Sequence, residues 1–447
     1  MMMSGHKLWS RFPLLGSTVP VLGAFVLLAF LLSPSAKSQA AKPGSAHLDS
    51  VEVTGSKRFS SGQIVSTLGM RPGITVNRDD LQGVADRLGA LGVFSKVQYR
   101  FTTIESGVRV TYEVADASGL PVVFDNFPWF TDDELIADLK RDVPLFDGNA
   151  PRSGSILDAM SGALENLIQV RGAFAHVSHS LVRSAVKDEE VQQFRVDGAE
   201  IKIQGVEFSD ALAKTDSAIQ DRLPDLVGKP FSRSRVELFE FEQVRPVYLS
   251  HAFLRVKFGP PVARFTADPN KPLPDAVTIL APIDPGPAFS WAGIAWNGNS
   301  AIPSNELNAL VDLKPGDTAD GMKIEAIWER VRTIYAERGY LDATLNPAAL
   351  FNTDTSHVAY SVTITEGPQY HMGNLVLTGL SLEGEKRIRA AWKIPHGAVF
   401  NKNIYEEFLE HGIKQAFVGI PVHYEKIGRF LQQDANSASV DVLLDFQ

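Results

Sequence analysis

The chain has 447 residues, of which 44% are hydrophobic and 21% charged, so it can bury several cores and does not have a disordered composition. Its formal net charge of -9 argues against a nucleic-acid binder, because DNA and RNA attract basic proteins. The absence of cysteine excludes disulfides, thiolate metal sites, a cysteine nucleophile and attachment through a lipidated cysteine.

The N-terminal residues have the character of an export segment. Basic residues precede the apolar stretch Val19–Leu32, and Ser38–Ala40 supplies small residues where a signal peptidase cuts. We predict a signal peptide over residues 1–40 and a linker over 41–47. The alternative is an uncleaved anchor, because Leu14–Leu32 has about 19 residues, just enough to span a bilayer. On either interpretation the bulk of the chain lies outside the cytoplasm.

The next residues predict a compact unit of two helices and a small sheet. An alternating run ends in a glycine, two helical segments flank a Pro-Gly breaker, and two runs with period-two alternation follow. In chain order these segments are Val51–Gly55, Gln63–Leu68, Arg71–Gly73, Asp79–Leu91, Lys96–Phe101 and Val108–Val114. The predicted order is therefore β-α-α-β-β.

Similar units recur at intervals of roughly 70 to 90 residues, the range expected for tandem small domains. First strands ending in glycine recur at Ile201–Gly205, Ile294–Gly298 and Leu375–Gly379, and breakers between helices recur at Val227–Pro230, Lys314–Gly316 and Pro395–Gly397. After the second helix a glycine recurs as Gly92, Gly172, Gly339 and Gly419, while the third unit has His251 there. We predict a helix-terminating turn at each of these glycines, because glycine accepts positive φ without a Cβ clash.

This pattern resembles the polypeptide-transport-associated (POTRA) domain, whose order is β-α-α-β-β. The residues that carry the resemblance are the strand-glycine starts, the Pro-Gly breakers, the turn Gly92–Phe94 and the terminal run Val362–Tyr370. The resemblance implies an α+β fold of five tandem POTRA-like domains in an elongated array. The expected domain boundaries are 48–117, 118–199, 200–286, 287–368 and 369–447.

Five such domains resemble the periplasmic part of the Bam-type outer-membrane β-barrel assembly factors. In that family a transmembrane barrel follows the array, whereas the last strand here, Ser439–Phe446, belongs to the fifth unit, and we expect no barrel in this chain. The resemblance implies a periplasmic protein associated with the outer membrane. Its implied partners are unfolded outer-membrane β-barrel precursors or a separate barrel or envelope protein, and it implies no cofactor.

The sheet edges are the candidate binding sites, because an edge strand has unpaired N–H and C=O groups that another extended chain can satisfy. In the family the last strand is central, so the strand after the helices is an edge. We expect edges at Lys96–Phe101, Ala175–Leu181, Leu254–Phe258, Asp342–Asn346 and Val422–Lys426. The expected partner-binding residues are Lys96, Val97, Gln98, Tyr99, Asp342, Ala343, Thr344 and Leu345. The alternative is that these edges are solvated or covered by neighbouring domains.

We expect Gln98 and Thr344 to hold N–H groups that remain available for pairing, because neither predicted edge contains a proline before Pro347. Catalytic motifs are lacking, and we expect no enzyme activity. His176 and His179 fall three apart on a predicted strand, where odd spacing sends side chains to opposite faces and disfavours a shared metal. The aromatic residues Phe124, Phe127, Trp129 and Phe130 cluster at the start of the second unit and form either a core or a contact with a client or with another domain.

Two functions from different classes remain open. The first is a non-catalytic scaffold or chaperone-like module for outer-membrane protein assembly, which binds client strands by β-augmentation. The second is an inner-membrane-anchored envelope scaffold, held by an uncleaved N-terminal segment.

Overall fold

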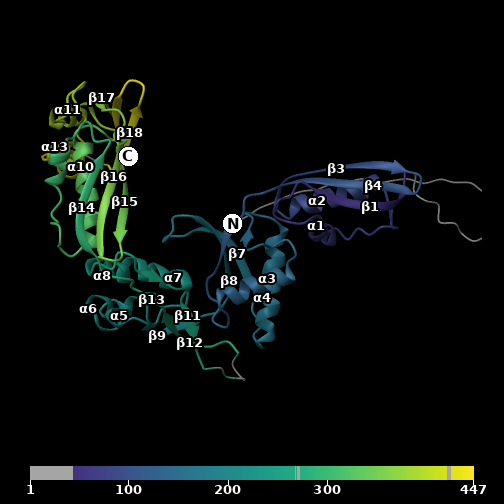
Figure 1. Ribbon diagram of the computed structural model, residues 1–447. Helices are drawn as coiled ribbons and strands as arrows, with labels where there is room; N and C mark the ends of the chain where they lie inside the picture. Colours follow the sequence, from purple (N-terminus) through teal and green to yellow (C-terminus); the bar gives the residue numbers. More distant parts are fainter. Residues whose placement is uncertain (1–43, 267, 269–271, 420–423) are drawn as a thin grey trace, which may run out of the picture.

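The computed structural model describes residues 44–266, 268, 272–419 and 424–447. The predicted signal peptide, the alternative anchor Leu14–Leu32 and residues 41–43 of the predicted linker lie outside the described residues. The last two residues of that linker, Ala46 and His47, belong to the first strand. Within the described ranges, no helix combines the length and the apolar character that crossing a bilayer requires. Small mixed sheets with their helices follow one another along a bent string (Figure 1). Each recurrence of the order β-α-α-β-β is called a unit below.

The first two units each add one short strand between the helices. The first unit comprises β1 (Ala46–Thr54), α1 (Ser61–Thr67), β2 (Thr75–Val76), α2 (Arg78–Ala90), β3 (Phe94–Ile104) and β4 (Gly107–Asp116). The second comprises β5 (Leu120–Phe124), α3 (Asp132–Asp142), β6 (Asn149–Ala150), α4 (Ser155–Val170), β7 (Val177–Arg183) and β8 (Glu190–Val196).

The third unit is the most broken, with its helical part divided into several short pieces. Its first half comprises β9 (Lys202–Phe208), α5 (Ala211–Thr215), α6 (Ser217–Gln220) and the 3₁₀ turn η1 (Leu223–Asp225). Its second helix runs as α7 (Arg233–Phe239), the π-helical turn η2 (Glu240–Val244) and α8 (Arg245–Ser250). The strands β10 (Lys257–Phe258), β11 (Val262–Arg264), β12 (Ala276–Ala281) and β13 (Ile283–Asp284) complete it.

The last two units return to the simpler pattern. The fourth comprises β14 (Ser290–Asn297), α9 (Ser304–Asn308), α10 (Gly321–Glu337), β15 (Thr344–Asn352) and β16 (His357–Thr365). The fifth comprises β17 (His371–Thr378), α11 (Leu382–Ala391), α12 (Lys402–Glu407), the π-helical turn η3 (Phe408–Gly412), α13 (Ile413–Ala416), β18 (Ile427–Asp434) and β19 (Ser439–Phe446).

Every main sheet has the same topology, with the last long strand in the centre. The strand orders are β2-β1-β4-β3, β6-β5-β8-β7, β11-β12-β9, β14-β16-β15 and β17-β19-β18. The central strand is parallel to the first strand of its unit and antiparallel to the strand on its other side. This mixed arrangement of helices and strands is the predicted α+β fold, with POTRA-like folds in tandem.

The cores form where the helices cover one face of each sheet. In the fourth unit, Ile324, Ile327, Val331 and Tyr335 lie on one face of α10 at helical spacing and are all buried. On the central strand the buried residues alternate instead, as they do throughout β19. The aromatic residues of the second unit belong to this layer: Phe124, Phe127 and Phe130 are buried. The prediction that these aromatic residues form a core is therefore confirmed for Phe124, Phe127 and Phe130.

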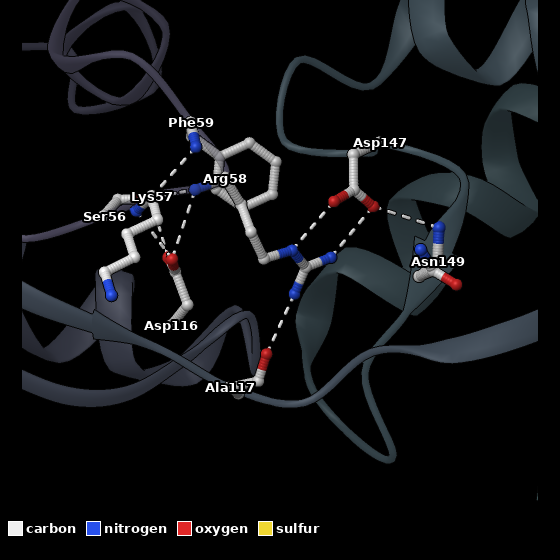
Figure 2. A network of polar contacts seen from close by, with 8 residues as sticks. All are labelled: Ser56, Lys57, Arg58, Phe59, Asp116, Ala117, Asp147 and Asn149. Carbon is white, nitrogen blue, oxygen red and sulfur yellow. Dashed lines mark hydrogen bonds and ion pairs between the residues drawn. The ribbon is translucent and has the colours of Figure 1, made fainter.

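Adjacent units are joined by specific contacts. Buried residues of the first and second units form one continuous apolar core, which runs from Leu48 to Val196. At the same joint Arg58 reaches Asp147 of the second unit and the carbonyl of Ala117, as Figure 2 shows. The first two units therefore share an apolar core and are also joined by the hydrogen bonds of Arg58.

A buried arginine joins the second and third units. Arg233, at the start of α7, is 3% exposed and donates to the carbonyls of Phe124 (3.0 Å) and Phe127 (3.1 Å) of the second unit. It also pairs with Asp132. Burial lowers the pKa of the guanidinium, and the nearby Asp132 opposes that shift. Because the cation is desolvated, its binding of several carbonyls specifies one orientation of the two units.

Candidate functional site

One edge of each sheet is covered by its own chain. In four units the breaker between the helices folds back, and its glycine donates an N–H to a carbonyl of the first strand. These pairs are Gly73 to Leu48 (2.7 Å), Gly228 to Ile203 (2.7 Å), Gly316 to Trp291 (2.8 Å) and Gly397 to Met372 (2.6 Å). All four glycines have φ between 78° and 94°, a conformation that costs other residues strain. The predicted breaker thus protects the start of the first strand, a role that sequence reasoning missed.

The opposite edge is formed by the strand that follows the second helix. In the first, second, fourth and fifth units this strand is β3, β7, β15 and β18, each at the end of its sheet. Each of them exposes one large hydrophobic side chain. These are Phe101 (48%), Leu181 (41%), Leu350 (58%) and Phe430 (56%). The edges that could accept another strand therefore also present an apolar contact.

The predicted binding residues of the first unit lie together on β3. Lys96, Val97, Gln98 and Tyr99 pair in order with Ala115, Val114, Glu113 and Tyr112 of β4. Lys96 and Gln98 are exposed, whereas Val97 and Tyr99 are half-buried toward the helices. The structure therefore brings these four residues to one edge with alternating faces.

The predicted residues of the fourth unit are divided between the edge and a joint. Thr344 and Leu345 begin β15, whereas Asp342 and Ala343 precede it. Asp342 accepts a hydrogen bond of 2.6 Å from the hydroxyl of Tyr370, which lies in the core of the fifth unit. Asp342 therefore connects two units.

Two of the predicted edges are wrong in position. In the third unit, of the range Leu254–Phe258 only Lys257 and Phe258 form a strand, and β10 pairs with β13; the edge of the main sheet is the short β11. In the fifth unit, Ile420 to His423 lie outside the described residues, and the edge strand begins at Ile427. Lys426 exchanges backbone hydrogen bonds with Gln447, next to the first pair of β18, so the predicted range meets this edge only at its last residue.

The direction of the N–H groups corrects the expectation for Gln98. The two-residue loop at Glu105 and Ser106 closes on the pair Ile104–Gly107, which in such a hairpin is hydrogen-bonded. Every second residue from Ile104 then bonds to β4, so the N–H of Gln98 points inward. The N–H groups of Val97, Tyr99, Phe101 and Thr103 point outward instead.

The same alternation holds for β15. Pro347, which has no N–H, lies opposite Val362 within an unbroken run of strand pairs. A proline at an inward position would remove a hydrogen bond from this ladder, so Pro347 lies at an outward position. Leu345, Ala349 and Phe351 share that direction. Thr344 is one residue out of phase, so its N–H points toward Thr365, and the expectation of an available donor at Thr344 is wrong.

A groove runs beside β3 where α2 packs against it. It has a volume of about 390 Å³ and is lined by Gln82 and Ala85 of α2 and by Val97 and Tyr99 of β3. Tyr112 fixes the helix above the sheet, since its buried hydroxyl donates to the carbonyl of Leu81 at 3.0 Å. Burial raises the pKa of Tyr112, so the phenol stays neutral and remains a donor.

The turn glycines after the second helix adopt the conformation that the pattern predicts. Gly92, Gly172, Gly339 and Gly419 have φ between 81° and 84°. In the third unit the positive φ, 65°, falls on Ala252, one residue after His251. The departure of the third unit is thus a shift of one residue in the turn, with alanine in the left-handed conformation.

His176 and His179 both face α4 rather than opposite sides. His176 Nδ1 lies 2.6 Å from Glu165, and His179 Nε2 lies 3.3 Å from Asp158. The expectation of opposite faces is wrong because His176 precedes the first residue of β7, where strand alternation does not apply. Among residues 44–266, 268, 272–419 and 424–447, no group of three or more histidine, aspartate or glutamate side chains could hold a metal ion.

Comparison with known proteins identifies the class of domain. The model of the family described as "POTRA: Surface antigen variable number repeat" matches residues 46–116 and 290–367, the first and fourth units. These two segments are POTRA domains. Units of the same topology lie between and after the two matched segments, so POTRA-like folds follow one another in tandem.

A curated relative from Treponema pallidum (strain Nichols), a putative outer membrane protein assembly factor, is 22% identical over 135 residues. The match covers 30% of this chain and only 16% of the length of that relative. Among solved structures, POTRA3-5 of BamA from Haemophilus influenzae is 18% identical, with a TM-score of 0.41, and the match covers 55% of this chain and 96% of that one. The N-terminal domain of Omp85 from Thermosynechococcus elongatus is 11% identical with a TM-score of 0.22, over 91% of this chain and 98% of that one.

Proposed function

We propose that this chain is a non-catalytic periplasmic scaffold for outer-membrane protein assembly, which binds extended segments of unfolded β-barrel precursors or of a separate envelope protein. The proposal extends to five POTRA-like domains with the boundaries 48–117, 118–199, 200–286, 287–368 and 369–447. It is supported by the POTRA match and by the relative named as an outer membrane protein assembly factor.

The single observation that carries the mechanism is the asymmetry between the two edges of each sheet. The breaker glycine covers the start of the first strand, whereas β3, β7, β15 and β18 lie at the end of their sheets. A backbone edge of this kind accepts an added strand with little regard to side-chain sequence. Such tolerance suits a protein that handles many different precursors.

The experiment compares variants at an outward position of β3. Phe101→Pro removes one outward N–H, while Phe101→Ala removes the exposed ring and keeps the donor. Binding of peptides that copy outer-membrane barrel strands is followed by NMR shift changes in the whole chain. We expect the proline variant to weaken binding at the first unit by at least tenfold and the alanine variant to weaken it less.

A matched pair in the fourth unit repeats the test. Ala349→Pro removes an outward donor of β15, and Ala349→Ser retains it. If peptides bind the proline variants of both units as tightly as the wild-type chain, strand addition is not the mechanism. If neither unit of the wild-type chain binds barrel-strand peptides, the proposed role in client binding fails as well.

A further inference from the structure

The edge strands differ in charge. β3 carries Lys96 and Arg100, β7 carries Arg183, and β18 carries Arg429 and Asp434, whereas the nine residues of β15 include no aspartate, glutamate, lysine or arginine. Charged side chains on an edge strand discourage pairing with other chains, since their hydration is lost on contact. Of these four edges, β15 is therefore the one without charged protection.

The lack of charge extends across the sheet beside β15. On β16, Val358, Tyr360, Val362 and Ile364 face the core, so the alternate residues Ala359, Ser361 and Thr363 lie on the face away from the helices. Cross-strand rows on that face are Gly293–Ala359–Leu350, Ala295–Ser361–Ala348 and Asn297–Thr363–Asn346. None of these nine residues is charged, and most are small. The name "neutral face" is used for these three rows.

Leu350 is the projecting apolar side chain of the neutral face. It is 58% exposed, and its row neighbours are a glycine and an alanine, which leave its flank uncovered. The other side of β15 is also apolar, because Leu345, Ala349 and Phe351 are half-buried against the core of the fourth unit. Arg255 stacks over the ring of Phe351, 5.5 Å from its centroid, at the hairpin end of the strand.

Pro347 divides the strand and limits the length that can pair. Outward N–H groups remain at Leu345, Ala349 and Phe351, whereas Pro347, between Leu345 and Ala349, has no N–H to donate. The longest uninterrupted part is therefore Ala348–Asn352, which includes Leu350. Pairing over this part would place an incoming side chain next to Leu350 on the neutral face.

We propose that β15 binds an extended polypeptide segment without charged residues, paired over Ala348–Asn352, with an aliphatic side chain beside Leu350. This inference rests on the proposed function and specifies its ligand at the fourth unit. A carboxylate or ammonium group in the added strand would lose water beside Leu350 and Ala348 and would find no opposite charge on the neutral face. The fourth unit thus selects uncharged segments, whereas the basic residues of β3 give the first unit no preference for them.

The test uses the whole chain and two fluorescent peptides, measured by anisotropy. One peptide alternates valine and threonine between uncharged polar tails, and the other has glutamate in place of the threonines. Leu350→Lys is the probe, and Val376→Lys, at an exposed valine on β17 of the fifth unit, is the matched control. Thermal melts of both variants establish that they fold.

We expect Leu350→Lys to weaken the uncharged peptide at least tenfold and to improve the glutamate peptide, while Val376→Lys changes either by less than twofold. Unchanged binding in Leu350→Lys overturns the inference. A third variant, Phe101→Lys, puts the same charge on the exposed edge residue of β3. If only this variant loses binding, the peptide binds at β3, which overturns the inference and leaves the proposed function intact. Sedimentation of the chain alone tests whether a second copy of the chain occupies β15. If the chain forms a dimer that Leu350→Lys abolishes, and the wild-type chain does not bind the peptides, the inference is also overturned.

Discussion

The guanidinium of Arg58 meets the carboxylate of Asp147 in two parallel hydrogen bonds, Nε to Oδ2 at 2.8 Å and Nη2 to Oδ1 at 2.9 Å (Figure 2). Their side chains are 20% and 30% exposed, and the third nitrogen of Arg58 donates to the carbonyl of Ala117 at 2.9 Å. The arginine therefore fixes the second unit and the segment between β4 and β5 at once. The hydrogen bonds to Arg58 lower the pKa of Asp147, so the carboxylate stays charged in mild acid.

Asp147→Asn should loosen this joint. It removes the charge of a bidentate pair that is partly shielded from water, so we expect a loss of about 1 to 2 kcal/mol in the free energy of unfolding of the first two units. The distribution of distances between spin labels on α1 and α3 should also broaden. The control is Asp49→Asn, whose partner Arg109 is 63% exposed and which should cost far less. Equal melts and equal distance distributions for the two variants would contradict this role.

Gly92→Ala should destabilise two units rather than one. Gly92 has φ 84°, and a Cβ atom there would overlap the carbonyl oxygen of Ser153 in the second unit. The left-handed conformation alone costs about 1 to 2 kcal/mol, and the displaced backbone adds to it. The matched control is Gly172→Ala, with φ 81° but only ordinary contact with Pro272 at 3.5 Å. Hydrogen exchange should rise in both α2 and α4 of the first variant; a rise confined to α2 would show that the joint tolerates the side chain.

Glu240→Gln should remove a pH dependence of stability in the third unit. Glu240 is 2% exposed, and burial, with the nearby charge of Glu237, raises its pKa to about 8. A carboxyl whose pKa rises on folding holds its proton in the folded state, so its contribution is fully present below about pH 4.5 and is lost as the pH rises through 8. The wild-type third unit should lose roughly 3 to 5 kcal/mol over that range, and the variant should not. Parallel melting curves for both proteins from pH 5 to 9 would be inconsistent with a buried, protonated Glu240.

Proline substitutions along β3 should alternate in their cost to stability. Arg100→Pro removes an N–H that bonds to Thr111 of β4, and we expect a loss of about 3 kcal/mol. Phe101→Pro removes an outward N–H and should cost less than half of that. Thermal unfolding of the two neighbouring variants measures the difference directly. A larger loss for Phe101→Pro would reverse the assignment of inward and outward donors.

Local pattern was enough to predict the order of elements and the turns. Alternation in Val51–Gly55, helical spacing in α10 and the turn glycines each depend on φ, ψ and side-chain period within a few residues. The recurrence of these patterns predicted POTRA-like folds in tandem. In the third unit, His251 in place of a glycine showed that the turn differs, but local reasoning could not show how. An alanine with positive φ, as at Ala252, leaves no signal in the sequence.

Only the tertiary structure decided which edges are covered and where the backbone donors point. The breaker glycines bond to strands about 25 residues away, and the inward or outward direction of the N–H of Gln98 depends on the register that the hairpin loop imposes. The joints were equally hidden, because Arg58 and Asp147 lie 89 positions apart and Arg233 contacts carbonyls of the preceding unit. A sequence shows the residue types and their spacing along the chain, whereas these contacts depend on how separately folded units come together in space.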